Sequence, residues 1–215
     1  MLNIRHFFFN PFQERTYVIW DGSRKGAVID PGFLEEHEEI QFFSFIRSQG
    51  TDLGAVLLTH AHIDHVYGVS ACLREFPGIK VYLSPEDKFI KEHSAQMADW
   101  MRMPRPDTAW ETEGIYDGQV IRTGELELKV ISTPGHTPGG VCFYDAKDGD
   151  LFSGDTLFSG SIGRTDLPGG DYDKIIKSIS EKLAGLDGAV RVHPGHGWDS
   201  TIGTEKLCNP FLQIG

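Results

Sequence analysis

The sequence has few cysteines, and their spacing suggests neither a disulfide framework nor a redox motif. The three cysteines, Cys72, Cys142 and Cys208, are odd in number and far apart, so no Cys-x-x-Cys pair occurs. Cys72 and Cys142 lie in apolar stretches, where a cysteine is usually a small core residue. Free cysteines are typical of a reducing compartment, and we therefore expect a cytoplasmic protein.

Long hydrophobic runs and an excess of positive charge are also missing. The N-terminal run Phe7-Phe8-Phe9 ends at Asn10-Pro11 and is far too short for a signal peptide or a membrane span. Lys and Arg number 20 against 31 Asp and Glu, which gives a net charge of -11. Binding to nucleic acid or to an anionic membrane requires basic patches, so we expect neither partner.

What is present is the composition of an ordinary globular protein. The chain has 215 residues, of which 40% are hydrophobic and 24% charged, and this favours one domain over residues 1–215. Hydrophobic patterns predict helices over residues 35–48, 64–76 and 171–184, and one beginning at Pro85. In the first helix, Ile40, Phe43 and Ile46 are expected to face inward. The predicted strands are residues 2–9, 16–20, 26–29, 55–58, 79–83, 119–122, 126–131, 141–144, 151–153 and 189–192. This order favours an α/β fold with two sheets between layers of helices over a fold in which strands and helices simply alternate.

The most informative stretch follows the predicted buried strand at residues 55–58. It contains His60, His62, Asp64 and His65 within a few positions. His60 and His62 are two apart in extended chain, so both side chains leave the backbone on the same side. Asp64 and His65 open the next helix and point in different directions. The segment can therefore supply ligands to one metal and to a second metal nearby, at the strand end where ligands of α/β sheets collect.

Three later segments repeat the pattern of a predicted strand followed by a metal-binding residue type. They deliver His136, Asp155 and His196, each within a turn rich in glycine or proline. Such turns let a side chain point back over the edge of a sheet. Nitrogen and oxygen donors of this kind suit zinc, iron or manganese. We expect two divalent metal ions, with zinc as the first choice and iron or manganese as alternatives.

These motifs together resemble those of the metallo-β-lactamase-fold hydrolases. The resemblance rests on four motifs: His-x-His-x-Asp-His at residues 60–65, Pro-Gly-His at 134–136, Ser-Gly-Asp-Thr-Leu-Phe at 153–158 and the final Gly-His at 195–196. The similarity spans residues 30–196 and is greatest with short members of the glyoxalase II-like branch, which lack a C-terminal helical domain. It implies a four-layer αββα sandwich with a two-metal site.

The resemblance also implies roles for individual residues. His60, His62 and His136 would hold the first metal. Asp64, His65 and His196 would hold the second, and Asp155 would bridge the two; Asp64 and Asp155 would be the catalytic carboxylates. Asp30 matches an aspartate that orients a ligand histidine in this family. Asp30 could alternatively be only a turn residue before Pro31-Gly32.

A hydroxide held between two metals suits the hydrolysis of an activated acyl compound. A small-molecule thioester is a good substrate because its thiol, with a pKa near 8.5, leaves without much help from an acid. Arg164 lies where glyoxalase II has a basic residue that binds a carboxylate of glutathione, and an arginine there could form a bidentate pair. Alternatively, Arg164 is a loop residue held by Asp166 or Asp171. Asp166 replaces a tyrosine of that family.

Two other functions and one structural question remain open at this stage. Gly163-Arg164-Thr165-Asp166 also resembles persulfide dioxygenases, which use one iron held by residues matching His60, His62, His136 and Asp155. A metal-binding module without catalysis is the third hypothesis. Residues 93–114, rich in methionine and tryptophan, are either a lid or substrate wall or simply a packed excursion. The oligomeric state is not predicted.

Overall fold

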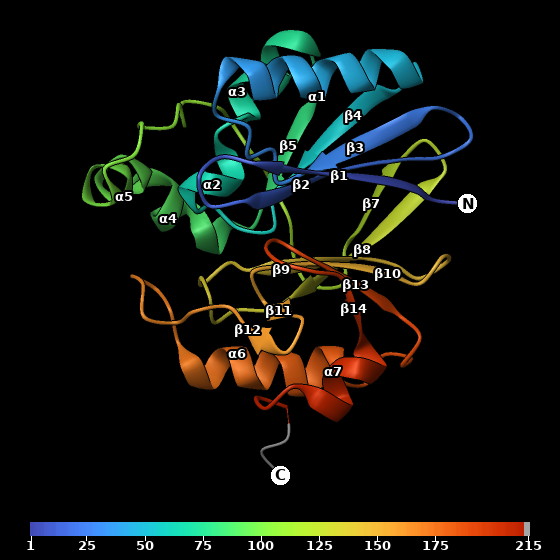
Figure 1. Cartoon of the computed structure of the whole chain (residues 1–215), viewed down its shortest axis with the longest axis vertical. Helices are drawn as coiled ribbons and strands as arrows, with labels where there is room; N and C mark the ends of the chain where they lie inside the picture. Colours follow the sequence, from blue (N-terminus) through green and yellow to red (C-terminus); the bar gives the residue numbers. More distant parts are fainter. Residues whose placement is uncertain (213–215) are drawn as a thin grey trace.

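The computed structural model describes residues 1–212, in which two six-stranded sheets lie face to face between two layers of helices (Figure 1). The expected arrangement of two sheets between helices is therefore present. The first sheet has the order β1-β2-β3-β4-β5-β6 and the second β14-β13-β10-β9-β8-β7. A small two-stranded sheet, β11-β12, is separate from both. No helix within residues 1–212 is long and apolar enough to cross a membrane.

The first sheet comes from the N-terminal half of the chain. Its strands are β1 (Asn3–Phe9), β2 (Glu14–Trp20), β3 (Lys25–Ile29), β4 (Asp52–Leu57), β5 (Lys80–Leu83) and β6 (Glu113–Gly114). β3, β4, β5 and β6 run parallel to one another. β2 is antiparallel to both of its neighbours, β1 and β3. Helices α1 (Glu36–Gln49) and α3 (Val69–Glu75) cover the outer face, at the top of Figure 1.

The second sheet comes from the C-terminal half. Its strands are β7 (Val120–Thr123), β8 (Leu126–Ser132), β9 (Val141–Asp145), β10 (Asp150–Gly154), β13 (Arg191–Pro194) and β14 (Ser200–Thr201). Its outer face is covered by α6 (Tyr172–Ser178), the wider turn η2 (Ile179–Leu183) and α7 (Ile202–Cys208). β11 (Leu157–Phe158) and β12 (Ser161–Ile162) lie close to this layer.

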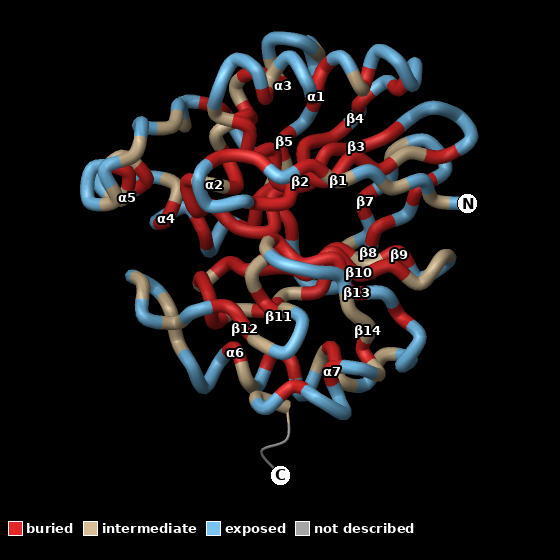
Figure 2. The backbone as a smooth tube through the Cα atoms, viewed as in Figure 1, coloured by how far each residue is buried: buried red, intermediate tan, exposed pale blue. Residues whose placement is uncertain are grey.

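The core has three hydrophobic layers, one between the sheets and one under each helical layer. β4 shows how one strand serves two of them, because alternate residues point to opposite faces. Its Ala55 and Leu57 pack between the sheets, whereas Val56 packs under α1. The central strands of both sheets, such as β2 and β10, are accordingly buried, whereas the edge strands β1, β7 and β14 are mostly exposed or half-buried (Figure 2). Cys72 and Cys142 are buried and Cys208 is exposed, and all three are free.

The helical predictions need two corrections. In α1, Ile40 is 57% exposed, and Phe42 joins Phe43 and Ile46 in the core instead. Ile40 lies to the side of the stripe that these three residues form. The predicted helix 64–76 is divided into α2 (Ile63–Val66) and α3, with Gly68 between them. A Cβ at Gly68 would lie 2.5 Å from the ring of Phe33, so the glycine lets this ring approach the backbone.

Four short helical segments lie to one side of the two sheets, at the left of Figure 1. They are α2, the single turn η1 (Pro85–Asp87), α4 (Lys88–Glu92) and α5 (Ser94–Met101). The α5 helix and the C-terminal α7 helix were not predicted. Both are short, and residues 93–114 lack a clear apolar period in the sequence. Of these segments, α2 and α5 contribute lining residues to the cavity described next.

Candidate metal centre

The candidate ligands meet at one edge of the sheet sandwich because the strands before them end there. β3 and β4 are parallel, and Asp30 and His60 follow their carboxyl ends. In the second sheet, β9 is antiparallel to both β8 and β10, and β10 is parallel to β13. The carboxyl ends of β8, β10 and β13 therefore share one edge, and His136, Asp155 and His196 follow them.

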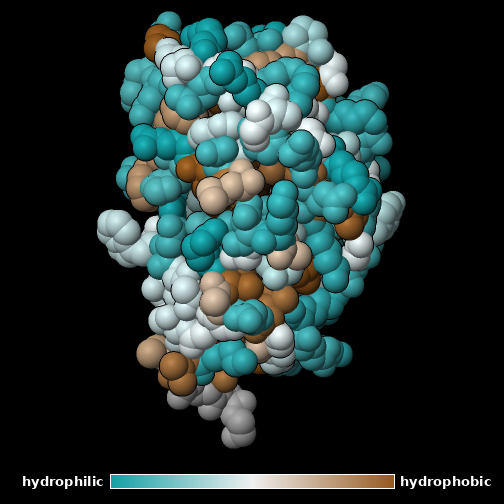
Figure 3. Space-filling view, turned by 90° about the vertical axis from the view of Figure 1, so that its right-hand side faces the viewer, coloured by the Kyte–Doolittle hydropathy of each residue, from teal (hydrophilic) through white to brown (hydrophobic). Residues whose placement is uncertain are grey.

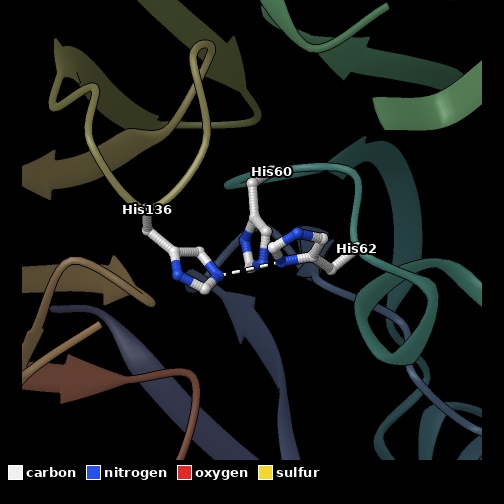
Figure 4. Close-up of side chains that lie close together, drawn as sticks. All are labelled: His60, His62 and His136. Carbon is white, nitrogen blue, oxygen red and sulfur yellow. Dashed lines mark hydrogen bonds between the residues drawn. The ribbon is translucent and has the colours of Figure 1, made fainter. Parts of the chain in front are cut away.

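The first group consists of His60, His62 and His136. One ring nitrogen of each lies within 4.8 Å of the others, and all three side chains are buried. The rings point toward one another from two separate segments of the chain (Figure 4). Nδ1 of His62 and Nε2 of His136 are 2.9 Å apart. Two imidazole nitrogens at this distance need a proton or a cation between them, because their lone pairs otherwise repel.

The second group consists of Asp64, His65 and His196, whose candidate ligand atoms also lie within 4.8 Å of one another. Oδ2 of Asp64 is 3.2 Å from Nε2 of His196 and 3.7 Å from Nε2 of His65. His65 is fully buried, whereas Asp64 and His196 are partly exposed. A divalent ion held by these three residues would thus be open to solvent on one side.

Asp155 lies between the two groups. Its Oδ2 is 3.4 Å from Nε2 of His136, and its Oδ1 is 3.5 Å from Nε2 of His65. One carboxylate therefore faces a histidine of each group. A carboxylate has two oxygens and can bind two metal ions at once. The positions predicted from the sequence, from His60 to His196, are all brought together.

Several buried polar atoms at this edge have no hydrogen-bond partner. Within residues 1–212 these include Nε2 of His60, His62 and His65, together with Oδ1 of Asp155. A buried polar atom without a partner costs roughly 1–3 kcal/mol, so a cluster of four is costly unless a ligand satisfies it. Imidazole nitrogens and carboxylate oxygens are suitable donors for zinc or iron. The residues present therefore fit divalent metal ions.

Two of the histidines are held by backbone carbonyls. Nδ1 of His136 lies 2.7 Å from the carbonyl oxygen of Arg164, and Nδ1 of His196 lies 3.1 Å from that of Phe12. A carbonyl oxygen only accepts, so Nδ1–H must donate in both pairs. Nε2 of each ring is then the nitrogen that points into the site and, when unprotonated, can bind a metal.

His60 and His65 are held by a shared carboxylate. Asp30 accepts the backbone N–H of Thr59 through Oδ1, at 2.7 Å, and the Thr59 hydroxyl through Oδ2, at 2.6 Å. The hydroxyl proton is thus committed to Asp30, and the Thr59 oxygen must accept from Nδ1 of His60, 3.0 Å away. Oδ2 of Asp30 also accepts from Nδ1 of His65, at 3.0 Å. Both histidines are left with Nε2 free to bind a metal.

Asp30 is at the same time a turn residue. Its φ is 49°, in the left-handed region that aspartate and asparagine tolerate better than most side chains. The two sequence interpretations of Asp30 are thus compatible. Thr59 was not predicted, because a threonine before a histidine carries no signal of its own. Gly154 allows Thr59 this position, since a Cβ there would lie 2.3 Å from the Thr59 hydroxyl oxygen.

The carboxylates make the site favourable for a cation. Burial alone would lower the pKa of His65, but Asp64, Asp155 and Asp30 outweigh it and raise this pKa well above 6.5. In the first group, burial and the neighbouring His136 lower the pKa of His62 to about 3. Burial would raise the pKa of Asp64, but His65 and His196 lower it below its usual value. The carboxylates thus favour positive charge at the second group, whether it is carried by a proton or by a metal ion.

Arg15 and Asp199 secure the turn that carries His196. Arg15 is only 2% exposed, and its Nη1 donates to Oδ1 of Asp199 at 2.6 Å and to the carbonyl of Gly197 at 3.3 Å. Its backbone N–H donates to the carbonyl of Gly195 at 2.8 Å. His193 is hydrogen-bonded to Asp199 at 3.3 Å and to Asp150 at 2.8 Å. None of these supports was predicted from the sequence.

A cavity of about 400 Å³ opens beside the two groups. Besides His62, Asp64, His136, Asp155 and His196, its lining residues are Phe12, Met97, Met101, Phe158, Ser161, Ile162, Arg164 and Leu167. Met97 and Met101 belong to α5, so the start of segment 93–114 forms a cavity wall. Trp110, by contrast, is buried under the first sheet. The interpretation as a substrate wall thus applies to the part with Met97 and Met101, and the interpretation as a packed excursion applies to the part with Trp110.

Arg164 lines this cavity, but its side chain already has a partner. Nε and Nη2 of Arg164 donate to the two carboxylate oxygens of Asp166, each at 2.7 Å. This is the loop pairing considered as the alternative in the sequence. Both side chains are exposed, so a substrate carboxylate could compete with Asp166 for the arginine.

Comparisons with known proteins identify similar chains and similar folds. Residues 9–196 match the sequence model of the Metallo-beta-lactamase superfamily. The chain is 36% identical to "Hydroxyacylglutathione hydrolase GloC" of Haemophilus influenzae over 98% of both chains. Among solved structures, it is similar to BLEG-1 B3 metallo-beta-lactamase, with a TM-score of 0.90, 32% identity, and 98% of this chain and 100% of that chain covered. It is also similar to TTHA1623 in a di-iron-bound form, with a TM-score of 0.86, 36% identity, and 97% of this chain and 100% of that chain covered.

Proposed function

The chain belongs to the metallo-beta-lactamase superfamily and has its αββα fold, and from this premise we propose that it is a dinuclear metal-dependent hydrolase of small-molecule thioesters. The relative named hydroxyacylglutathione hydrolase matches the chain over nearly its whole length and supports a reaction of glyoxalase II type. In this proposal His60, His62 and His136 hold one metal, Asp64, His65 and His196 hold the other, and Asp155 bridges them.

The observation that carries the proposal is the position of Asp155. Its two oxygens face His136 and His65, which belong to different groups, at 3.4 and 3.5 Å. A single-metal site would use only one of these contacts. Divalent ions held by these residues would lower the pKa of a bound water toward neutrality and so would supply a hydroxide nucleophile. We propose zinc as the resident metal, with iron, supported by the di-iron relative, or manganese as alternatives.

The protein's own contribution is to hold donors in fixed positions and protonation states. Asp30, Thr59 and the carbonyls of Phe12 and Arg164 accept from Nδ1 of four histidines, so that Nε2 of each ring is aimed into the site and can bind a metal. Such supporting contacts commonly change metal affinity or activity 10- to 100-fold. We assign the catalytic carboxylates to Asp64 and Asp155, which both line the cavity where substrate would bind.

The cavity favours a thioester over an amide. A leaving thiolate, with a thiol pKa near 8.5, needs little protonation, whereas an amide nitrogen must receive a proton before it leaves. Apart from the proposed metal ligands, only Ser161 and Arg164 among the lining side chains of the described part of the chain carry N–H or O–H groups. Neither gives up a proton readily at neutral pH. We place this reaction in the cytoplasm, in keeping with the three free cysteines, and propose no nucleic-acid or membrane partner.

The two alternatives predict a different use of the same residues. A mononuclear-iron persulfide dioxygenase would need His60, His62, His136 and Asp155, and would leave Asp64, His65 and His196 without a task. A non-catalytic metal-binding module would have no need for a 400 Å³ cavity beside the metal groups. Both alternatives therefore account for less of the structure than the dinuclear hydrolase does.

The proposal is tested by assaying the full chain with S-lactoylglutathione and, separately, by oxygen uptake with glutathione persulfide. We expect thioester hydrolysis and no oxygen uptake. Asp155→Ala should abolish turnover, while the matched control Asp173→Ala, on the exposed side of α6, should leave it unchanged. Oxygen uptake without hydrolysis would establish the dioxygenase, and the absence of both would favour the non-catalytic module.

A further inference from the structure

The cavity beside the metal groups adjoins a second cavity of about 360 Å³. The second cavity lies between helices α4 and α5 and the loop of residues 166–168. Met97 and Leu167 line both cavities, so the two cavities adjoin at these side chains. A volume of this size is within the range of small-molecule sites, which run from about 300 to 1,000 Å³.

The second cavity is almost entirely apolar. Its polar lining is limited to His93, Gln96 and Asp166. The apolar lining residues are Phe89, Ile90, Met97, Trp100, Leu167 and Pro168. Trp100 is 69% exposed and Phe89 48% exposed. Large apolar side chains that gather around one hollow indicate a binding site. On the opposite side of the molecule, shown in Figure 3, hydrophilic residues predominate and hydrophobic ones form only limited patches.

This cavity is built on well-packed residues. Ile90 is 3% exposed and anchors α4 in the core. Gly169, with a φ of 89°, would place a Cβ 2.8 Å from Pro138 and 3.5 Å from Ile90, so the loop after Pro168 packs closely against both. Nδ1–H of His93 donates to the carbonyl of Phe89 at 2.8 Å. The α4 helix and the loop after Pro168, which frame the cavity, are therefore fixed by packing.

The chemistry of the lining selects one part of a thioester. Water-soluble thiol carriers are rich in amide and charged groups, which this lining cannot satisfy. The charged side chain here is Asp166, and it is already paired with Arg164. An alkyl chain, by contrast, gains free energy when it leaves water for an apolar wall. The acyl side of the substrate is thus the part that fits.

We propose that the substrate class is the medium-chain acyl thioesters, with the alkyl chain in the cavity lined by Phe89, Trp100 and Leu167 and the carbonyl at the metal groups. This inference rests on the proposed thioester hydrolysis. In that reaction the oxygen of water bonds to the carbonyl carbon, the carbon–sulfur bond breaks, and the sulfur leaves with the electron pair and takes up a proton. The products are a carboxylic acid and a free thiol, and no other reactant is needed.

The test is the chain-length dependence of kcat/KM with S-acyl thioesters of N-acetylcysteamine, a small neutral carrier, from acetyl to decanoyl. Burial of each methylene predicts an increase of roughly two- to fourfold, until the cavity is filled. Trp100→Ala and Phe89→Ala should each lower the ratio of the octanoyl to the acetyl value roughly fivefold. Ile40→Ala removes an apolar side chain on α1 whose exposure, 57%, lies between those of Phe89 and Trp100; it is outside both cavities and should leave the whole series unchanged.

A second readout does not depend on turnover. Calorimetry with unreactive 2-oxoalkyl thioethers of N-acetylcysteamine should show tighter binding as the alkyl chain lengthens, and Trp100→Ala should remove most of this gain. Hydrolysis of all chain lengths at equal kcat/KM would overturn the acyl-chain inference and leave the proposed function intact. A preference that follows the length of the thiol instead would also overturn it. If no thioester is hydrolysed, the proposed function fails and the inference fails with it.

Discussion

Nδ1 of His65 lies 3.0 Å from Oδ2 of Asp30, a residue 35 positions earlier in the chain. The same carboxylate oxygen accepts the hydroxyl of Thr59, which in turn holds His60. Asp30 therefore fixes the tautomers of two histidines that we assign to different metals. A single carboxylate outside the proposed ligand set thus connects both halves of the site.

Replacing this carboxylate tests that connection. Asp30→Asn preserves the side-chain shape and tolerates the φ of 49° at this position. The amide is a weaker acceptor and carries no charge, so we expect the affinity for both metals to fall about 10- to 100-fold with the fold retained. Titration of the metal-free protein with zinc measures this. Wild-type affinity for both ions would show that Asp30 serves only the turn.

Arg15 gives a selective test of the second metal. Its side chain and backbone hold the turn from Gly195 to Asp199, which presents His196. Arg15→Met keeps most of the length of the side chain and the backbone N–H but removes the two side-chain donations, so His196 should lose its position while the first histidine group stays assembled. We expect one metal to be lost at modest chelator concentration and the other to be retained. Equal loss of both ions would contradict this role.

His193 should make stability depend on pH. Burial lowers its pKa, but hydrogen bonds to Asp150 and Asp199 outweigh this and raise the pKa above 6.5. A group with a raised pKa in the folded state stabilises below its unfolded pKa, and this contribution disappears as pH rises through the folded value. His193→Gln should thus lower the free energy of unfolding, relative to the wild type, by more at a pH below 6.5 than at about pH 9. Urea unfolding of both proteins at the two pH values measures the difference, and an equal cost at both would refute the assignment.

Substitutions of Arg164 and Asp166 test whether the substrate places a carboxylate near the cavity. Since the two side chains are paired, Asp166→Asn should free the arginine and lower KM for S-lactoylglutathione. Arg164→Ala should raise KM severalfold with a smaller change in kcat, as expected for a group that binds a remote part of the substrate. Steady-state kinetics of the two variants decide this. If neither variant changes KM, the pair is only a loop contact.

The positions of most strands along the chain and of the candidate site residues could be predicted because they depend on local patterns. Apolar runs mark the strands, and His60, His62, His136, Asp155 and His196 lie within five residues after such runs. The supports of the site could not be predicted in this way. Arg15 and Asp199 are 184 residues apart, as are Phe12 and His196. Such pairings exist only after the two sheets have packed together.

Errors within elements have a similar origin. The helical period alone could not decide between Ile40 and Phe42, because that choice depends on how α1 is rotated over the first sheet. The break at Gly68 depends on the ring of Phe33, which comes from another segment. Short elements such as α7, whose N-cap Thr201 accepts from the backbone of Thr204, bury too few residues to leave a clear pattern.

The central claim is that the site holds two metal ions and that Asp155 joins them. It is tested most directly by counting metals on protein purified without added metal, for the wild-type chain and for Asp155→Ala, with Asp173→Ala as the control. We predict two divalent ions per chain in the wild type and the control, and the loss of at least one in Asp155→Ala. A single ion in the wild type, or an unchanged pair in Asp155→Ala, would contradict the account.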